Sequence, residues 1–167
     1  MQVQPTLKGM GKVIGKKAHD FSLKDHQGGV VTLTSALKDG PILLVFYPGD
    51  FTPVCTKQLC TYRDRIEDFR KYGVQILGIS ANDPESHAKF VKEYDFPFLL
   101  LSDPEGETAK KYECQSFLML GRVSRAVFII NSKGLILYRY VEPTILTRRK
   151  PEELIAILDD LKANKLL

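Results

Sequence analysis

Residues 42–55 read ILLVFYPGDFTPVC, a hydrophobic run that passes through a short loop to a cysteine. The run at 42–47 is hydrophobic at every position, so both of its faces must be covered, which is typical of a central strand in a sheet flanked by helices. A second run at 74–79 predicts a neighbouring strand, reached by a crossover through a helix over about 53–71. The cysteine at position 55 would then lie in the first turn of that helix.

The rest of the chain alternates short hydrophobic runs with helical periodicity. Runs at 126–130 and 135–138 are separated by NSKG, whose residues favour a hairpin, so the sheet should be mixed and not purely parallel. The final segment from Pro151 places Leu154, Ile155, Leu158 and Leu161 at helical spacing. Further helices are expected at 84–94 and 105–112, and an N-terminal hairpin or short edge strands at 21–23 and 30–33. The pattern predicts an α/β fold with a mixed central sheet flanked by helices.

Length and composition fit one domain over 1–167, with 1–14 as a flexible N-terminal segment. The chain has 167 residues, of which 44% are hydrophobic, enough for one substantial core but too short for two ordinary domains.

The charge pattern argues against a nucleic-acid or membrane partner. The net charge of +4 comes from 24 basic and 20 acidic residues spread along the chain, and the densest basic run is only Arg148–Lys150. We interpret this run as a solvated approach to the last helix. No hydrophobic segment has the character of a signal peptide core or the length of a membrane span, so a cytoplasmic location is expected.

Three cysteines, Cys55, Cys60 and Cys114, are an odd number without a secretory signal, which favours free thiols over a structural disulfide framework. At the start of a helix, backbone N–H groups and the helix dipole favour the thiolate of Cys55. Its helical stripe continues through Leu59, Tyr62, Ile66 and Phe69, so Cys55 should face the sheet. A buried cysteine with no other feature would be an ordinary small core residue.

The residues around Cys55 decide between these readings. The pattern P-x-x-x-T-x-x-C at 48–55 resembles the peroxiredoxin active-site motif, and FYPGDFTPVCTKQLC at 46–60 is similar to its bacterioferritin comigratory protein subfamily. The resemblance extends from about residue 15 to the last helix and implies the thioredoxin-like peroxiredoxin fold. It implies that Cys55 is the peroxidatic cysteine, that Thr52 makes a hydrogen bond at the peroxide, and that Pro48 shields the sulfur from water. A hydroxyl placed three residues upstream can orient a peroxide, although Thr52 could also be an ordinary N-cap.

The resemblance also places the family's conserved arginine at Arg125, directly before the strand that begins AVF. A fixed cation there would stabilise the thiolate and the negative charge on the leaving oxygen. Arg122 lies only three positions away, but the fit to the strand favours Arg125.

Cys60 is the candidate partner of Cys55 after oxidation to sulfenic acid. Five residues along an ideal helix separate the two Cα atoms by about 8 to 9 Å. That exceeds the disulfide limit of about 7 Å, so the helix must unwind before the two sulfurs can join. The C-x-x-x-x-C spacing matches the subfamily's resolving cysteine, with Cys114, a second subunit's cysteine or an external thiol as alternatives. Gln58 stands where many peroxiredoxins carry glutamate, which leaves the surrounding hydrogen-bond network open.

The sequence gives weaker support to three other functions. A zinc site would combine the cysteines with His19, His26 or His87, but there is no second closely spaced pair, and the histidines are expected at the surface. A thioredoxin-type reductase would carry C-x-x-C, whereas position 58 is Gln. A holdase chaperone on the same fold is a third possibility, which retained oligomer switching without peroxidase turnover would favour.

The partners expected are a hydroperoxide substrate and thioredoxin or a similar dithiol as reductant, as the resemblance implies. No phosphate-binding loop or haem motif is found, and we predict no cofactor or metal. The subfamily resemblance implies a monomer or a homodimer.

Overall fold

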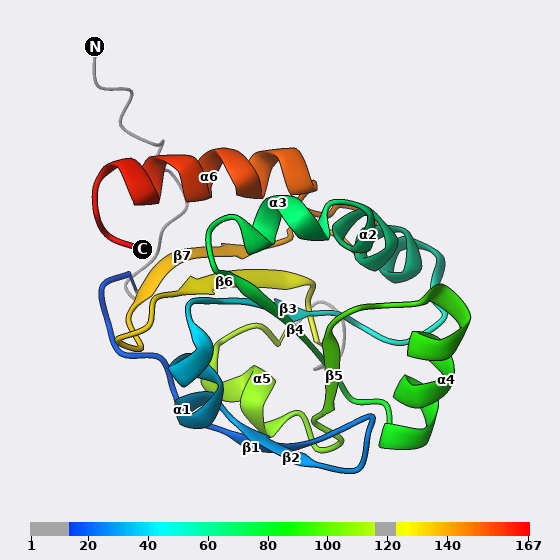
Figure 1. Ribbon diagram of the computed structural model, residues 1–167. Coiled ribbons are helices and arrows are strands. Elements are labelled where there is room, and N and C mark those ends of the chain that lie inside the picture. Colours follow the sequence, from blue (N-terminus) through cyan, green and yellow to red (C-terminus); the bar gives the residue numbers. More distant parts are fainter. Residues whose placement is uncertain (1–13, 116–122) are drawn as a thin grey trace.

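The computed structural model describes residues 14–115 and 123–167, and within them seven strands form one mixed sheet (Figure 1). The order across the sheet is β2-β1-β5-β4-β3-β6-β7. The strands are β1 (Ser22–Asp25), β2 (Val30–Thr32), β3 (Ile42–Phe46), β4 (Gln75–Ser80), β5 (Leu99–Ser102), β6 (Ala126–Ile130) and β7 (Ile136–Val141). The helices are α1 (Leu33–Ala36), α2 (Pro53–Asp64), α3 (Ile66–Arg70), α4 (Pro84–Tyr94), α5 (Glu107–Lys111) and α6 (Pro151–Ala163). The predicted α/β fold with a mixed sheet is confirmed, whereas the expected flexible segment at 1–14 lies almost entirely outside the described residues.

The strand β3 lies inside the sheet, as predicted, and every one of its residues is buried. It runs parallel to β4 and antiparallel to β6, with Phe46 paired to Ile79 on one side and to Ala126 on the other. Because the pairing with β6 is antiparallel, the chain that leaves β3 emerges beside the residue that precedes Ala126. This register brings the loop after β3 next to Arg125.

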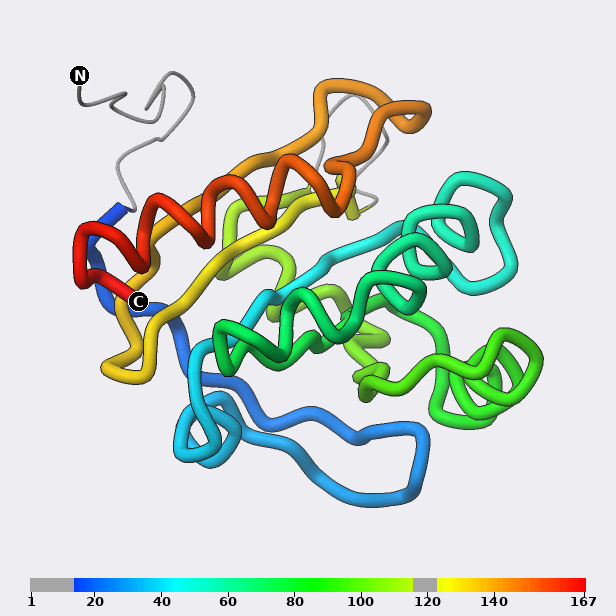
Figure 2. Tube along the Cα trace, turned by 45° about the horizontal axis from the view of Figure 1, so that its top comes forward, coloured from blue at the N-terminus to red at the C-terminus, as the bar shows by residue number. Residues whose placement is uncertain are grey.

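Alternate residues of β3 enter two cores on opposite faces of the sheet, as the period of two in a strand requires. Leu43 and Val45 join a cluster with side chains from α2, α3, α4 and α6. Leu44 and Phe46 join a second cluster, which contains residues of α1 and α5. Figure 1 shows α2, α3 and α6 above the sheet and α1 and α5 below it, and in Figure 2 α6 again lies along β6 and β7.

The strand β5 and the helix α1 had not been predicted, and two predicted boundaries differ by three residues or more. The single helix expected over 53–71 is two helices, because Arg65 leaves the helical conformation (φ −112°, ψ 18°) between α2 and α3. The Arg65 guanidinium bonds Asp68 in α3 and Glu152 in α6, so the bend is tied to the last helix. The strand β7 continues to Val141, beyond the expected end at 138, because its pairing with β6 persists to Ala126.

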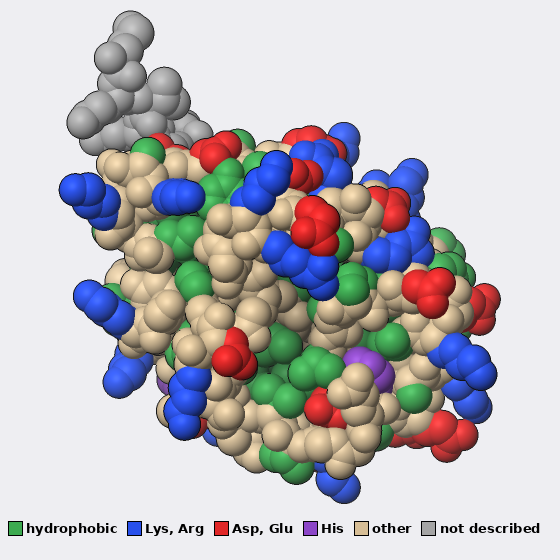
Figure 3. All heavy atoms as spheres, viewed as in Figure 1, with side chains coloured by type: hydrophobic (Ala, Val, Ile, Leu, Met, Phe, Trp, Pro, Cys, Tyr) green, Lys and Arg blue, Asp and Glu red, His purple; other side chains and the backbone are tan. Residues whose placement is uncertain are grey.

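Charged side chains of both signs are interspersed on the face shown in Figure 3, with hydrophobic side chains between them. This face therefore presents no single basic stripe of the kind that nucleic-acid binding requires. Among residues 14–115 and 123–167, no helix is long and apolar enough to cross a membrane.

Candidate active site

Cys55 is the third residue of α2, directly after the loop that leaves β3. Its side chain is fully buried in the cluster between the sheet and α2, together with Tyr47, Leu59 and Tyr62. The first backbone N–H groups of a helix have no intrahelical partner, and with the helix dipole they favour an anion in this turn. The structure therefore places Cys55 in the first turn and on the sheet-facing side, as predicted.

Arg125 lies against the sulfur of Cys55. The antiparallel register described above delivers it from the start of β6, and its Nη1 donates to Cys55 Sγ at 3.0 Å. The residue is only 3% exposed, so this contact is shielded from solvent. The structure thus brings the two predicted residues together, while Arg122, the neighbouring candidate, lies outside the described residues.

Three other acceptors fix the orientation of the Arg125 guanidinium. Nη1 also donates to Gln58 Oε1 at 3.0 Å, Nε donates to the Thr147 carbonyl at 3.2 Å, and Nη2 donates to the Ile145 carbonyl at 3.4 Å. Because the donors are held before any reaction, the charge needs no reorganisation when negative charge develops beside the sulfur.

Gln58 and Tyr62 extend this network, and sequence reasoning had not assigned Tyr62 a role in it. The Gln58 amide donates to Tyr62 Oη at 2.9 Å, and the Tyr62 hydroxyl donates to the Arg149 carbonyl at 2.7 Å. Burial raises the pKa of Tyr62, which keeps its hydroxyl protonated as a donor. The sequence spacing could have indicated this network, because Gln58 and Tyr62 lie three and seven residues after Cys55 and so share its helical face.

The basic run at 148–150 was expected to be solvated, and for Arg149 this prediction is wrong. Its Nε lies 3.1 Å from an oxygen of the buried Glu142, and its guanidinium stacks over the ring of Tyr140 at 3.9 Å. The reason is that β7 extends further than predicted, which places Tyr140 and Glu142 beneath the segment that leads into α6.

Thr52 and Pro48 lie together at the rim of a cavity of about 730 Å³. Thr52 is the N-cap residue of α2, but its hydroxyl donates to the Gly49 carbonyl at 2.9 Å and makes no side-chain capping bond to the helix. The hydroxyl oxygen of this cavity-lining residue is therefore not engaged by the helix N–H groups and can still accept a hydrogen bond. Arg125 forms part of the same wall, so the cavity leads to the guanidinium that contacts Cys55.

Most of the cavity lining is apolar. The apolar residues are Pro48, Pro53, Val54, Ala81, Pro104, Val123, Ile145 and Leu146. Ile145 and Leu146 are among the exposed large hydrophobic residues of the described chain, at 54% and 72%. A mainly apolar cavity whose lining includes the Arg125 guanidinium suits a ligand with a polar head and an apolar body.

Cys60 lies further along α2 and is half-buried at the edge of the same core. It forms no disulfide, and α2 is continuous from Pro53 to Asp64 through both cysteines. Burial raises the pKa of the Cys60 thiol, and the nearby Arg63 offsets part of this effect. In the intact helix Cys60 is thus a protonated thiol, held apart from Cys55.

Cys114 belongs to the other face of the sheet. It is 1% exposed within the second cluster, and its thiol donates to the Ala109 carbonyl at 3.4 Å. Burial raises its pKa to about 12, which keeps it a neutral thiol. The structure therefore does not bring Cys114 to the site.

The histidines were expected at the surface, and for His87 this prediction is wrong. His19 is exposed and His26 is half-buried, but His87 is fully buried between α4 and the sheet. Its Nδ1 lies 2.7 Å from Asp50 Oδ2. The spacing carried a signal, since His87 precedes Phe90 by three residues and so lies on the buried face of α4. Across the described ranges, no group of three or more His, Cys, Asp or Glu side chains could hold a metal ion.

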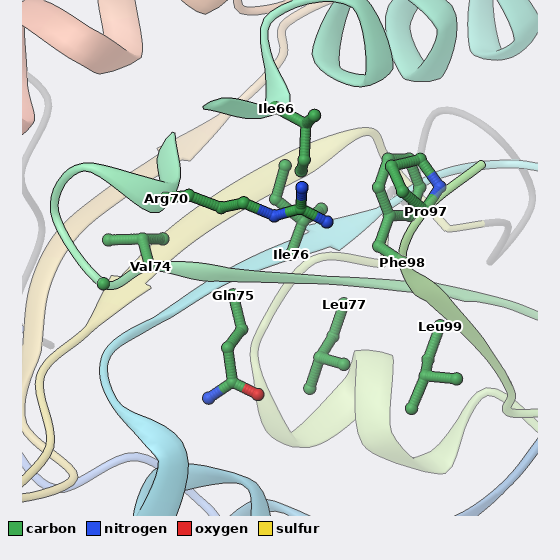
Figure 4. A pocket seen from close by; sticks show the side chains of 10 residues that line it. Ile66, Arg70, Val74, Gln75, Ile76, Leu77, Pro97, Phe98 and Leu99 are labelled. Atoms are coloured by element: carbon green, nitrogen blue, oxygen red, sulfur yellow. The ribbon is translucent and has the colours of Figure 1, made fainter. Parts of the chain in front are cut away.

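A second cavity of about 340 Å³ lies at the N-terminal ends of β4 and β5 (Figure 4). The view shows Ile66, Arg70 and Ile76 above the strands and Gln75 and Leu77 below them. None of the predicted site residues lines this cavity, and its one charged residue, Arg70, pairs with Glu67.

Comparisons with known proteins find similar sequences and structures. The AhpC/TSA family model matches residues 14–139. A chloroplastic peroxiredoxin Q of Triticum aestivum is 41% identical over 131 residues, which are 78% of this chain and 60% of the relative, so the chain spans about 60% of the length of that relative.

Two solved structures are also similar. The peroxidoxin BcpB of Mycobacterium tuberculosis has a TM-score of 0.78 and 31% identity, covering 92% of this chain and 98% of that one. The bacterioferritin comigratory protein of Xanthomonas campestris has a TM-score of 0.74 and 25% identity, covering 86% and 91%.

Proposed function

Because this chain belongs to the AhpC/TSA family, whose matched relatives are peroxiredoxins, we propose that it is a thiol peroxidase that reduces hydroperoxides through Cys55. The observation that carries the proposal is the contact of 3.0 Å between Arg125 Nη1 and Cys55 Sγ in the first turn of α2. A guanidinium and a helix N-terminus beside a sulfur are the two features that favour a nucleophilic cysteine.

In the first step the Cys55 thiolate attacks one oxygen of the hydroperoxide, forming an S–O bond as the O–O bond breaks. The sulfur is oxidised to sulfenic acid, and the other oxygen leaves as alkoxide or hydroxide and takes a proton to give an alcohol or water. Arg125 balances the charge as it moves from sulfur to the leaving oxygen. Thr52 orients the peroxide with its hydroxyl, and Pro48 keeps bulk water from the sulfur; both line the cavity beside Arg125.

Substrates include hydrogen peroxide and organic hydroperoxides. The mainly apolar lining of the cavity supports the second class, because an alkyl chain loses water contact there while the peroxide group reaches Arg125. The Xanthomonas campestris protein is itself described as having alkyl peroxide reduction activity.

In the second step Cys60 attacks the sulfenic acid of Cys55, which forms a disulfide and releases water. This step requires α2 to unwind, since five helical residues hold the Cα atoms about 8 to 9 Å apart. Thioredoxin or a similar dithiol protein then reduces the disulfide by exchange and becomes oxidised in turn. The cytoplasmic location and the monomeric or dimeric state remain predictions from the sequence.

Steady-state turnover tests this scheme. With dithiothreitol as reductant, the protein should consume hydrogen peroxide and cumene hydroperoxide catalytically, and Cys55→Ser should abolish both activities. Cys114→Ser is the matched control and should retain turnover, since Cys114 lies on the far face of the sheet. Full turnover by Cys55→Ser would contradict the proposal.

A further inference from the structure

A buried polar cluster contacts the loop between β3 and α2, which leads to Cys55. Asp50, in this loop, accepts hydrogen bonds from the Tyr47 hydroxyl at 2.7 Å and from the Ser86 hydroxyl at 2.8 Å. His87 Nδ1 lies 2.7 Å from Asp50 Oδ2, and the side chains of both residues are 0% exposed. The peroxidase steps above make no use of this cluster.

Both ring nitrogens of His87 have a hydrogen-bond partner. His87 Nε2 is 3.1 Å from the Leu101 carbonyl, which can only accept, so Nε2 carries a hydrogen. The Asp50 oxygen that accepts from Ser86 is the one that lies 2.7 Å from His87 Nδ1, and Tyr47 Oη lies 3.4 Å from the same nitrogen. Burial and the neighbouring Asp50 raise the pKa of Tyr47, which keeps that hydroxyl a donor. His87 thus contacts Asp50 through one ring nitrogen and the Leu101 carbonyl through the other.

The pair connects the loop to three other parts of the structure. It ties the Asp50 side chain to the end of β3, to the first turn of α4 and to β5. The backbone N–H of Asp50 donates to Asn82 Oδ1 at 2.9 Å, which adds a second anchor. The loop is thus held firmly up to residue 50, and any unwinding of the first turn of α2 must begin after it.

Phe51, the residue after Asp50, has a strained backbone. Phe51 has φ 60°, a left-handed conformation that is costly for an aromatic residue. Its side chain is 45% exposed and packs only partly, with its ring 4.9 Å from that of Phe90. Such strain persists where the surrounding structure enforces it, and here it adjoins Thr52 and the start of α2.

We propose that the Asp50–His87 pair is a positioning element that holds the strained loop in place and so sets the balance between intact and unwound α2. The inference rests on the proposed peroxidase function and extends it to how the two chemical steps are balanced. The intact form, with Cys55 beside Arg125, reacts with peroxide; the unwound form allows Cys55 to reach Cys60. A weaker anchor therefore slows the first step and speeds the second.

Two substitutions of His87 separate its two hydrogen bonds. His87→Asn keeps a donor near the position of Nδ1, which faces Asp50, whereas His87→Gln keeps one near Nε2, which faces Leu101. We expect His87→Gln to lower the rate constant for hydrogen peroxide by about tenfold, equivalent to about 1.4 kcal/mol, and to speed formation of the Cys55–Cys60 disulfide. His87→Asn should lie closer to the wild type in both rates. His19→Gln, at an exposed histidine, is the control and should match the wild type.

The peroxide rate is measured by competition with a second peroxidase, and the disulfide rate by acid quenching and mass spectrometry. A general loss of stability would not move the two rates in opposite directions. Should the His87 variants fold poorly, Ser86→Ala, which removes one hydrogen bond to Asp50, should move the two rates in the same opposite directions, and unchanged rates in that variant would overturn the inference.

Equal rates in wild type and His87→Gln, or a fall in both rates together, would overturn the inference while leaving the peroxidase intact. A wild-type protein that is inert to peroxide would overturn both the inference and the proposed function.

Discussion

At the scale of single residues, the site depends on one guanidinium held in a fixed orientation. Arg125 contacts Cys55 and Gln58 through Nη1, while two backbone carbonyls hold its other nitrogens. This arrangement needs a planar group with several donors, which an ammonium cannot supply.

We therefore expect Arg125→Lys to lower the rate constant of the peroxide reaction by about a hundredfold, although the charge is kept. The loss arises because the lysine nitrogen cannot reach the sulfur and the two carbonyls together. Stopped-flow measurement of peroxide consumption checks this, with Arg70→Lys at the exposed pair with Glu67 as control. A loss of less than about threefold would contradict a positional role for the guanidinium.

Tyr62 should matter for stability more than for chemistry. Tyr62→Phe leaves the buried Gln58 amide and the Arg149 carbonyl without their partner, which should lower the free energy of unfolding by about 1 to 3 kcal/mol. Urea denaturation measures this directly. Tyr72→Phe, whose hydroxyl bonds Asp159 at the surface, should cost about 0 to 1 kcal/mol. Equal losses of unfolding free energy in the two variants would mean that the buried hydrogen bonds of Tyr62 stabilise the fold no more than a surface hydrogen bond does.

The sequence was informative about residues that follow a pattern and uninformative about those that depend on long-range pairing. Cys55 and Thr52 could be predicted from the motif, and Arg125 from the strand that follows it. The burial of His87 depends on Asp50, which lies 37 residues earlier in the chain, and the stacking of Arg149 depends on how far β7 extends. Neither contact can be read from local periodicity.

At the scale of elements, α2 must be stable enough to hold Cys55 and weak enough to release it. Lys57 is exposed between the two cysteines, so substitutions there change helix propensity with little effect on packing. Lys57→Gly should weaken the helix by about 1 kcal/mol relative to Lys57→Ala, and so speed disulfide formation after oxidation by about fivefold. Quenched mass spectrometry compares the two variants. Identical rates would show that unwinding of α2 does not limit this step.

Most elements were predictable, because the hydrophobic runs match β3, β4, β6 and β7 and the helical pattern matches α4 and α6, whereas the inner strand β5 was not predicted. The bend at Arg65 was not, since the hydrophobic stripe continues from Tyr62 through Ile66 and Phe69 across it. The bend is instead tied to Glu152 in α6, a contact that exists only once the chain has folded.

At the scale of the whole molecule, the sheet separates two cores with different roles. One holds Cys55 and the site, and the other holds Cys114 as a neutral thiol with its pKa raised to about 12 from 9.0. Because the unfolded chain loses this proton at lower pH than the native state, Cys114 stabilises the fold below about pH 9 and this contribution is lost as the pH rises toward 12.

Urea unfolding at several pH values between 9 and 11 tests this linkage. The free energy of unfolding of the wild type should fall with pH more steeply than that of Cys114→Ala, by up to about 1.4 kcal/mol per pH unit. Other buried groups contribute equally to both proteins, so the difference isolates Cys114. Parallel slopes would contradict its burial as a neutral thiol.

The most direct measurement for the whole account is to treat the fully reduced protein with one equivalent of hydrogen peroxide and to map the state of each cysteine by mass spectrometry, with Cys55→Ser alongside. We predict rapid formation of a Cys55–Cys60 disulfide in the wild type, no such product in Cys55→Ser, and an unmodified Cys114 in both. If Cys55 stays a free thiol while peroxide remains in solution, the assignment of this chain as a Cys55-dependent peroxidase is wrong.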